Sequence, residues 1–276
     1  KRYTNAHQTK WGWDMSGASH LPELHEKLRA GGIMVRRLKK DVLTELPPKT
    51  RQIVELPANG ISAAVQAETR AWEASRERLR ELRAQVELAK AGESESAYEA
   101  AVKNLQDASR AAFAEISKLR HAVGLAKVPK VIEAIHDLID EDPEYKVVVA
   151  VHHHDVGDAI MADLGAQAVK LTGEMALEDR QASVDRFQTD PSVQVFVGSI
   201  MAAGVGITLT ASNHVIFAEL DFVPGNISQF EDRTHRIGQT DSVLIQHLVL
   251  EGSLDARMVK TIIEKDLGRS DKELAK

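Results

Sequence analysis

The chain has 276 residues, of which 43% are hydrophobic and 28% are charged, and it contains no cysteine. This composition excludes disulfides, cysteine nucleophiles and thiolate zinc sites and argues against disorder throughout, and no apolar run approaches the roughly 20 residues that span a membrane. The formal net charge of -6 is uneven, because residues 1–56 hold 11 Lys and Arg against 6 Asp and Glu whereas residues 128–252 hold 7 against 20, so a uniformly basic nucleic-acid binder is also excluded.

Residues 1–57 are predicted to form a connecting segment with one helix and one strand. Small and polar residues over 1–20 predict a loop. Leucines spaced by three and four residues predict a helix over 21–32, which a glycine pair would end. Alternating apolar residues predict a short strand over 51–56, shortly after a Pro-Pro pair. Since the sequence begins with Lys1 rather than Met, we expect it to be a piece of a longer chain.

Residues 58–127 are predicted to form a helical hairpin that protrudes from the rest of the chain. Ala, Glu, Arg, Leu and Gln dominate this stretch, and apolar residues recur at helical spacing on both sides of a turn at 92–94. The second helix of the hairpin is expected over 97–120. Its many charges fit a solvated face with ion pairs four residues apart, and a partner-binding surface is the alternative.

Residues 128–252 alternate between helices and apolar strands, which is typical of an α/β fold. The runs KVVVAV, AVKL, VQVFV, HVIFA and SVLIQHLVL predict strands that are apolar on both faces. Such strands indicate a mainly parallel sheet covered by helices on both faces, with functional loops at the carboxyl ends of the strands. Helices are expected over 131–139, 155–164, 176–187 and 227–235, and a last helix over 253–276.

The stretch QFEDRTHRIGQ, residues 229–239, contains two arginines three residues apart. At the end of a helix, Arg233 and Arg236 would project from one side, where two guanidinium forks suit a polyphosphate. Glu231 and Asp232 could orient them. A surface ion-pair cluster of little energetic consequence is the alternative, and the spacing alone favours neither.

Two further stretches follow predicted strands and could bring backbone N–H groups close to a phosphate. GSIMAAGVGITLT, residues 198–210, has small residues that allow close approach and three hydroxyl groups. LTG, residues 171–173, precedes a helix whose N-terminus could hold a nucleic-acid phosphate. In isolation, tight packing and ordinary helix capping explain these two stretches better.

Three consecutive histidines, His152, His153 and His154, follow the first buried strand of this region. Consecutive strand residues point to opposite faces and cannot converge on one ion, so we expect no metal site here. The sequence also lacks GxxxxGK[ST], GxSxG and GxGxxG motifs. Candidate arginine fingers without a phosphate-binding loop therefore indicate half of an ATPase.

Together these motifs resemble the C-terminal helicase lobe of the SWI/SNF-type DNA translocase ATPases, within helicase superfamily two. QFEDRTHRIGQ is similar to the last helicase motif of that family, and GSIMAAGVGITLT is similar to the motif before it. LTGEMALEDRQASVDRFQ, VVVAVHHHDV and MVRRLKKDVLTELPPKTRQIVELP resemble earlier motifs of the lobe and the connection between lobes. The opening WGWDMSGASHLPELHEKLR further resembles the subgroup of annealing helicases and fork-remodelling translocases. The resemblance covers nearly the whole chain and is weakest over 58–120.

The resemblance implies a RecA-like lobe with an inserted helical protrusion and an ATP site shared with a missing N-terminal lobe. That lobe would supply the phosphate-binding lysine and the Mg²⁺ carboxylates, so the parent is expected to be a DNA-dependent ATPase while this chain alone is inactive. The implied catalytic residues are Arg233 and Arg236, and the implied ATP-binding residues are Gln229, Asp232, Gly204 and Gly206. The residues implied to contact double-stranded or forked DNA are Thr172, Gly173, His153, Ser199, Thr208, Arg36, Arg37, Lys39 and Lys40.

The sequence departs from this family at two places. Phe222-Val223-Pro224 stands where the family usually has Trp-Asn-Pro, and Met201 stands where many members have a polar residue. Neither departure replaces an arginine. They affect the expected details of coupling and of contacts to the adenine, and they leave the class of protein unchanged.

Two other functions remain compatible with the sequence. The chain could be an autonomous DNA- or protein-binding regulatory module that has lost motor activity, with the 61–120 hairpin as its partner surface. It could also be half of an RNA helicase, although RIGQ and RRLK resemble the DNA translocases more closely. A monomeric motor without a membrane partner is the default expectation, cytoplasmic in a bacterium or phage and nuclear in a eukaryote.

Overall fold

The computed structural model describes residues 1–9, 12–15, 17–35, 43, 45–92, 94–204 and 206–260. It separates into two compact units, Lys1–Glu45 and Leu46–Lys276. The four basic residues that the resemblance assigns to DNA, Arg36, Arg37, Lys39 and Lys40, lie outside the described residues.

The first unit contains a small two-stranded sheet that the sequence did not predict. Strands β1 (His7–Thr9) and β2 (Gly12–Asp14) pair in antiparallel fashion, where a loop was expected. Gly12, the first residue of β2, takes a φ of 117°, which only glycine adopts readily. Both strands are too short to show periodicity in the sequence. The predicted helix is confirmed as α1 (Leu21–Ala30).

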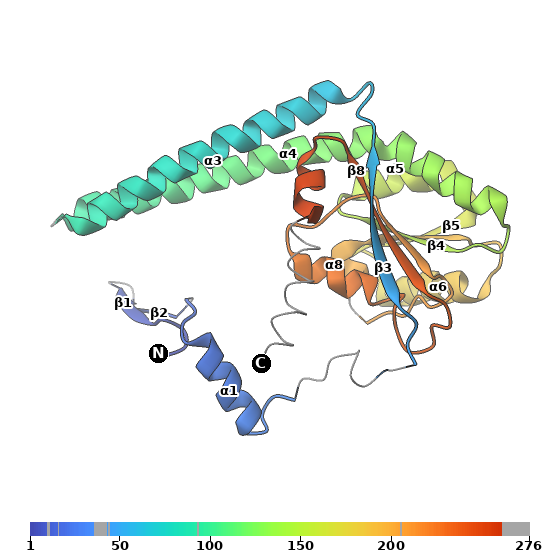
Figure 1. Ribbon diagram of the computed structural model, residues 1–276, viewed down its shortest axis with the longest axis horizontal. Helices are drawn as coiled ribbons and strands as arrows, with labels where there is room; N and C mark the ends of the chain where they lie inside the picture. Colours follow the sequence, from blue (N-terminus) through green and yellow to red (C-terminus); the bar gives the residue numbers. More distant parts are fainter. Residues whose placement is uncertain are drawn as a thin grey trace. The chain divides into compact units, whose positions relative to one another are not determined.

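The second unit is built on a six-stranded sheet in which every pairing is parallel, as predicted. From edge to edge the strands are β3 (Lys49–Leu56), β8 (Val243–Leu250), β7 (His214–Phe217), β4 (Val147–Val151), β6 (Val195–Ser199) and β5 (Ala168–Leu171) (Figure 1). Every residue of β4 and β6 is buried, because both faces of the sheet are covered. The strand predicted in the connecting segment is β3, and it forms one edge of this sheet.

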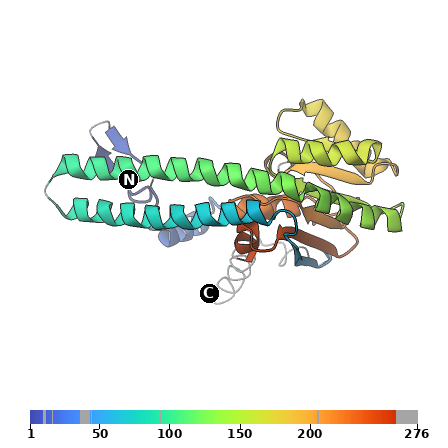
Figure 2. The ribbon, with the colours of Figure 1, turned by 90° about the horizontal axis from the view of Figure 1, so that it is seen from above.

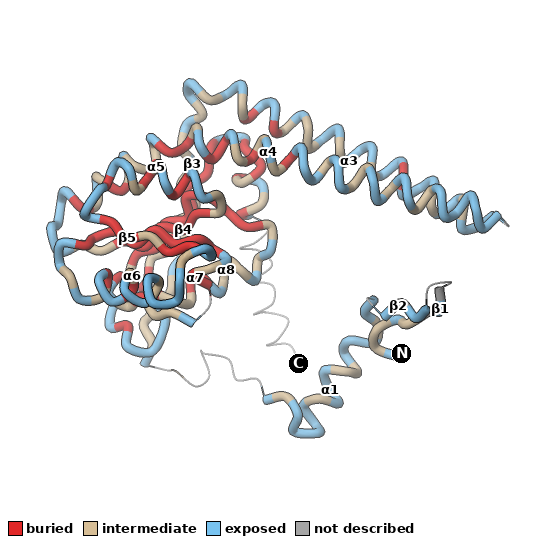
Figure 3. The backbone as a smooth tube through the Cα atoms, turned by 180° about the vertical axis from the view of Figure 1, so that it is seen from behind, coloured by how far each residue is buried: buried red, intermediate tan, exposed pale blue. Residues whose placement is uncertain are grey.

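Two hydrophobic cores lie on opposite faces of the sheet (Figure 3). On one face the rings of Phe187 and Phe196 lie 5.4 Å apart, and those of Phe217 and Phe230 lie 5.6 Å apart. Full burial of one such side chain contributes about 1.5–3 kcal/mol. The helices on this face are α6 (Leu177–Thr189), the short α7 (Ile200–Ala203) and α8 (Pro224–Glu231). The other face is covered by the C-terminal part of α4 (Glu95–Glu141) and by α5 (His154–Leu164), which the 3-10 turn η1 (Gly165–Gln167) follows.

The predicted hairpin is formed by α3 (Ser62–Ala91) and the N-terminal part of α4, which lie side by side (Figure 2). The separate helices expected over 97–120 and 131–139 are wrong, because α4 runs through both stretches and contains Pro129. A proline inside a helix costs about 3 kcal/mol or more. Burial of Val123, Val128 and Val131 on either side of it offsets that cost. The domain boundaries at 57, 127 and 252 stay predictions, although helix α4 is continuous across the second.

Buried charges join the base of the hairpin to a helical stretch at 254–260, the described part of the predicted last helix. The Arg120 guanidinium donates to Asp255 Oδ1 and to the Leu220 carbonyl, both at 2.8 Å. Lys127, 2% exposed, donates to the Leu248 carbonyl at 2.8 Å and lies 3.9 Å from Asp255 Oδ2, and burial lowers its pKa. On α3, Glu68 accepts from the Leu254 N–H at 2.8 Å, and burial raises its pKa.

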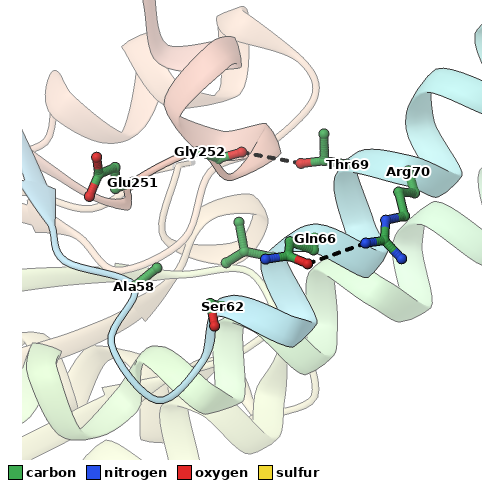
Figure 4. A pocket seen from close by; sticks show the side chains of 8 residues that line it. Ala58, Ser62, Gln66, Thr69, Arg70, Glu251 and Gly252 are labelled. Carbon is green, nitrogen blue, oxygen red and sulfur yellow. Dashed lines mark hydrogen bonds between the residues drawn. The ribbon is translucent and has the colours of Figure 1, made fainter.

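A cleft of about 410 Å³ lies beside this junction, between the start of α3 and the turn after β8 (Figure 4). Thr69 Oγ1 donates to the Gly252 carbonyl at 3.2 Å, and Arg70 donates to Gln66 Oε1 at 3.3 Å.

Across the described part of the chain, no helix is both long enough and apolar enough to cross a membrane.

We expect Asp255→Ala to destabilise the protein by about 3–5 kcal/mol, because it leaves Arg120 and Lys127 buried without their carboxylate. Urea unfolding followed by circular dichroism measures the change. The matched control is Asp137→Ala, which removes an exposed carboxylate from α4, the helix that carries Arg120 and Lys127. The free energy of unfolding of this variant should stay within about 0.5 kcal/mol of the parent value. Equal unfolding midpoints for the two variants would contradict the structural role of Asp255.

Candidate functional site

Four of the residues that the resemblance assigns to DNA lie where three neighbouring strands end. Thr172 and Gly173 follow β5, Ser199 ends β6, and His153 follows β4. These strands are adjacent in the sheet, in the order β4-β6-β5, so their carboxyl ends form one edge. A Cβ atom built on Gly173 would lie 4.0 Å from the Ala202 Cβ in α7, which shows how close the two loops are.

Arg180 of helix α6 stabilises the turn after β5 through hydrogen bonds to its backbone carbonyls. Arg180 donates through Nε to the Met175 carbonyl at 3.0 Å and through Nη2 to the Gly173 carbonyl at 2.5 Å. Helix α6 then begins without a side-chain cap, because its N-cap residue is Ala176. Uncapped N–H groups at the start of a helix suit an anion, so this turn could hold a phosphate.

The histidines after β4 are organised by Glu219, which the sequence analysis did not single out. Glu219 lies two residues after the end of β7 and is 4% exposed. Its Oε2 accepts the backbone N–H groups of His152 and His153, both at 2.8 Å, and its Oε1 lies 2.7 Å from His153 Nδ1. The available signal was a carboxylate that immediately follows the predicted strand HVIFA. Within the described ranges, no three His, Cys, Asp or Glu side chains are placed to hold a metal ion.

The two arginines lie on a turn and not on a helix. Helix α8 ends at Glu231, whereas the sequence predicted a helix over 227–235. His235 Nε2 lies 2.7 Å from the Pro47 carbonyl just before β3, and Gln239 donates to the Ser212 carbonyl at 2.8 Å just before β7. These contacts hold the turn at the edge where strands begin. The expectation that all functional loops lie at the carboxyl ends is therefore wrong for the arginines.

Within the described ranges, the hydrogen bonds of both guanidinium groups go to backbone carbonyls. Arg233 donates through Nε to the Gln229 carbonyl, and Arg236 donates through Nη1 to the Ile207 carbonyl, each at 3.2 Å. Among the residues with described positions, neither arginine forms an ion pair with a carboxylate. Arg236 is exposed and Arg233 is half-buried, and burial, together with the neighbouring Arg236 charge, lowers the pKa of Arg233. An anion between the two arginines would relieve this repulsion.

The acidic residues beside the arginines have other partners. Glu231, 1% exposed, binds Lys49 at 2.8 Å and Arg51 at 2.6 Å, both from β3, so it does not orient the arginines as suggested. Burial alone would raise the pKa of Glu231, but the charges of Lys49 and Arg51 lower it overall. Asp232 lies 3.5 Å from Lys49, and the side chain of Gln229 is exposed.

The glycine-rich segment after β6 connects the two edges of the sheet. It begins at Ser199 on the carboxyl edge and reaches the arginine turn, where the Leu209 N–H donates to the Arg233 carbonyl at 2.9 Å. Gly204 packs so closely that a Cβ would lie 2.8 Å from the Ile200 carbonyl oxygen, and Gly206 takes a φ of 77°. Thr208, between them and Leu209, is half-buried.

Comparison with known proteins gives this geometry a family. A model described as helicase conserved C-terminal domain matches residues 130–238, which include the histidines, the glycine-rich segment and the arginine turn. The SWI/SNF-related matrix-associated actin-dependent regulator of chromatin subfamily A-like protein 1 of Xenopus tropicalis is 36% identical over 270 residues, covering 96% of this chain and 25% of that protein. Residues 130–238 are therefore a helicase conserved C-terminal domain, and the chain is related in sequence to SWI/SNF-related proteins.

A further relative is similar in sequence, and two solved structures share the fold. The DNA annealing helicase and endonuclease ZRANB3 of Homo sapiens is 35% identical over 265 residues, covering 94% of this chain and 22% of that protein. The C-terminal part of the Fun30 ATPase domain has the same fold, with a TM-score of 0.50 at 19% identity, over 78% of this chain and 89% of that one. The Sulfolobus solfataricus SWI2/SNF2 ATPase core domain gives 0.52 at 22% identity, over 90% and 49%. The chain spans about a quarter of the length of the curated relatives.

The two departures from the family pattern have distinct positions in this helicase domain. The Phe222 ring lies 4.1 Å from the Arg120 guanidinium and 5.7 Å from the Phe113 ring, so it packs against helix α4 of the hairpin. Met201 is 61% exposed beside α8, where the Asn226 amide approaches its sulfur at 3.0 Å. Phe222 therefore replaces the family's tryptophan at a contact with the hairpin.

We expect the helicase domain to lose stability as the pH falls, and His247 to contribute to this loss. His247 is fully buried, stacked on Phe217 at 4.8 Å, and burial lowers its pKa to about 4. The unfolded chain takes up this proton below about 6.5, so the folded state is disfavoured progressively between pH 6.5 and pH 4. Between pH 7.5 and pH 5 the loss from this one group amounts to about 2 kcal/mol.

Urea unfolding of the parent and of His247→Phe at both pH values tests this contribution. The variant should have the shallower pH dependence, with the remaining slope due to groups such as His214, whose pKa burial also lowers. His25→Phe, at an exposed histidine of α1, should keep the parental slope. Identical slopes for the parent and His247→Phe would show that His247 does not carry this effect.

Proposed function

We propose that this chain is the second motor lobe of an ATP-dependent translocase on double-stranded DNA, with Arg233 and Arg236 as its arginine fingers. The observation that carries the proposal is the pair of adjacent guanidinium groups, each held by a carbonyl and neither neutralised by a carboxylate among the described residues. Guanidinium groups that are fixed in position and permanently charged can bind the terminal phosphate of a nucleotide through paired hydrogen bonds. Positive charge held in place stabilises the negative charge that develops during phosphoryl transfer.

The ATP site would be completed by a lobe that lies elsewhere in the protein. The chain lacks a GxxxxGK[ST] loop, and its described residues offer no cluster of carboxylates for Mg²⁺. Gln229 supports this arrangement through its carbonyl, which accepts from Arg233, and Asp232 lies in the same turn. Gly204 and Gly206 allow the preceding segment to lie against that turn.

DNA would bind at the opposite, carboxyl edge of the sheet. Gly173 offers an exposed backbone N–H to a phosphate, and His153 offers a ring nitrogen. Thr172 and Ser199, which are 7% and 8% exposed, contribute hydroxyl groups. Thr208 lies farther along the segment that Ser199 begins. The acidity of the lobe makes a narrow phosphate-binding strip more fitting than a broad basic surface, and Arg36, Arg37, Lys39 and Lys40 would add positive charge from the connecting segment.

Coupling between the two edges would run through residues 199–209. A shift of a phosphate against Ser199 moves the start of α7, and the hydrogen bonds of Ile207 and Leu209 carry that displacement to Arg236 and Arg233. Closure of the two lobes around ATP and their reopening after hydrolysis would thus change the contacts between this lobe and one DNA strand. Since the curated relatives are about four times as long, other parts of the parent protein would select the DNA structure.

We expect Arg233→Ala and Arg236→Ala, each made in a protein extended upstream to include the first lobe, to lower DNA-stimulated ATP turnover by a factor of about 10³–10⁵. Steady-state phosphate release with double-stranded DNA measures this loss. Arg83→Ala, at an exposed arginine of α3, should leave turnover unchanged. Parental turnover in either finger variant would refute the assigned role. An inactive extended parent that still binds DNA or a protein would favour a regulatory module that has lost motor activity.

We expect Gly206→Ala in the same extended protein to reduce stimulation by DNA more than basal hydrolysis. Its φ of 77° costs an alanine about 1–2 kcal/mol, so the segment between Ser199 and the arginine turn would be displaced. The ratio of turnover with and without DNA should fall several-fold. Gly225→Ala adds a methyl group in open space at an ordinary φ and should keep the parental ratio. A parental ratio in Gly206→Ala would exclude this segment as the coupling element.

A further inference from the structure

The Glu219 carboxylate fixes the turn after β4 through three hydrogen bonds. Oε2 accepts two consecutive backbone N–H groups, those of His152 and His153, and Oε1 faces the His153 Nδ1 at 2.7 Å. A carboxylate that receives three hydrogen bonds in a buried position fixes both the main chain and the ring beside it. The His153 side chain is 24% exposed, so the rest of its ring reaches the surface at the carboxyl edge.

The opposite side of Glu219 is closed by the hairpin helix α4. A Cβ atom on Gly124 would lie 2.5 Å from Glu219 Oε1, so the absence of a side chain there is what lets the carboxylate occupy its position. His121, one turn earlier on α4, stacks on His153 with ring centroids 4.3 Å apart. The position of His153 therefore depends on β7 and α4 as well as on its own strand.

The charged groups around His153 come from every element packed against it. Glu219 follows β7 and His121 belongs to α4, where its Nε2 lies 2.6 Å from Asp155 Oδ2 of α5. His152 packs edge-on against His153, and its Nδ1 lies 3.7 Å from Asp221 Oδ2. Burial lowers the pKa of His152, and the neighbouring His153 and Arg120 lower it further. The Lys127 ammonium also interacts with the Glu219 carboxylate.

We propose that Glu219 is a positioning residue that fixes the orientation and the tautomer of His153, so that the ring donates Nδ1–H inward and presents Nε2 at the carboxyl edge. An ionised carboxylate accepts hydrogen bonds and cannot donate them, so the proton of a neutral His153 ring must lie on Nδ1. Burial alone would raise the pKa of Glu219, but its bonds from His153 and His152 lower it overall, which keeps the carboxylate ionised.

This geometry has a consequence for phosphate binding, which rests on the proposed function. With Nδ1–H turned inward, Nε2 of the neutral ring carries a lone pair and repels a phosphate oxygen. To donate a hydrogen bond to phosphate, Nε2 must take up a proton from solvent, and the Glu219 carboxylate balances the new charge. Binding of DNA at His153 is therefore accompanied by uptake of one proton.

Nitrogen-15 NMR of the imidazole side chains in the 276-residue chain tests the tautomer without DNA. At pH 9, His153 of the parent should show the signals of the Nδ1–H tautomer. In Glu219→Gln the amide oxygen can keep the backbone bonds while its NH₂ faces Nδ1, so the ring should change to the Nε2–H form. Glu174→Gln, beside the exposed His154, should leave the His153 signals unchanged.

A second variant keeps the test decisive if Glu219→Gln fails to fold. Gly124→Ala displaces the carboxylate without changing a charge, and it should shift the His153 signals toward a mixture of tautomers. An unchanged Nδ1–H form in the folded variants, or an Nε2–H form in the parent, would overturn the role of Glu219.

Dissociation constants for a double-stranded oligonucleotide at pH 6 and pH 8.5 then test the proton uptake. Parental affinity should fall with pH by about tenfold more than that of Glu219→Gln, since uptake of one proton changes affinity by up to tenfold per pH unit. Equal pH dependence of the two would overturn the proton uptake. A chain that shows the expected tautomers and binds no DNA at any pH would refute the proposed DNA role of His153 and would support the positioning role of Glu219.

Discussion

The parallel direction of all six strands determines where the chemistry of this protein can lie. Each parallel strand needs a crossover that returns the chain to the same starting edge, and these crossovers bury both faces of the sheet. Side chains that face a ligand are then confined to the two edges where the strands end or begin. Thr172, Ser199 and His153 come together at one edge because β5, β6 and β4 are neighbours that end side by side.

Buried charges connect parts of the chain that lie far apart in the sequence. Glu231 binds two cations of β3, about 180 residues earlier, and Asp255 binds Arg120 at the base of the hairpin. Each such group costs desolvation free energy unless its partners are all in place, so these contacts favour one arrangement of the elements over others. The edge strand β3 and the last described helical stretch are fixed to the lobe in this way.

The two edges are joined by one short segment of the chain. Between Ser199 and Leu209 the chain passes through a helix of four residues and two glycines, one closely packed and one with a positive φ. Hydrogen bonds attach its far end to both arginines. An ATP site and a DNA site on opposite edges of one sheet would therefore be connected through this one segment.

The sequence by itself determined the α/β class, the parallel sheet, the hairpin and the family, because apolar strands, helical periodicity and the motif around Arg233 and Arg236 are local patterns. It could not determine that α4 continues through Pro129, since the packing of Val123, Val128 and Val131 outweighs a local helix-breaking preference. It placed the arginines on a helix, whereas contacts with Pro47 and Ser212 end that helix at Glu231 and hold the turn at the other edge. Glu219 was missed for the same reason, because only the tertiary structure brings its carboxylate to His153 and to the gap left by Gly124. Local spacing thus decided the elements, and long-range hydrogen bonds and packing decided their ends and their neighbours.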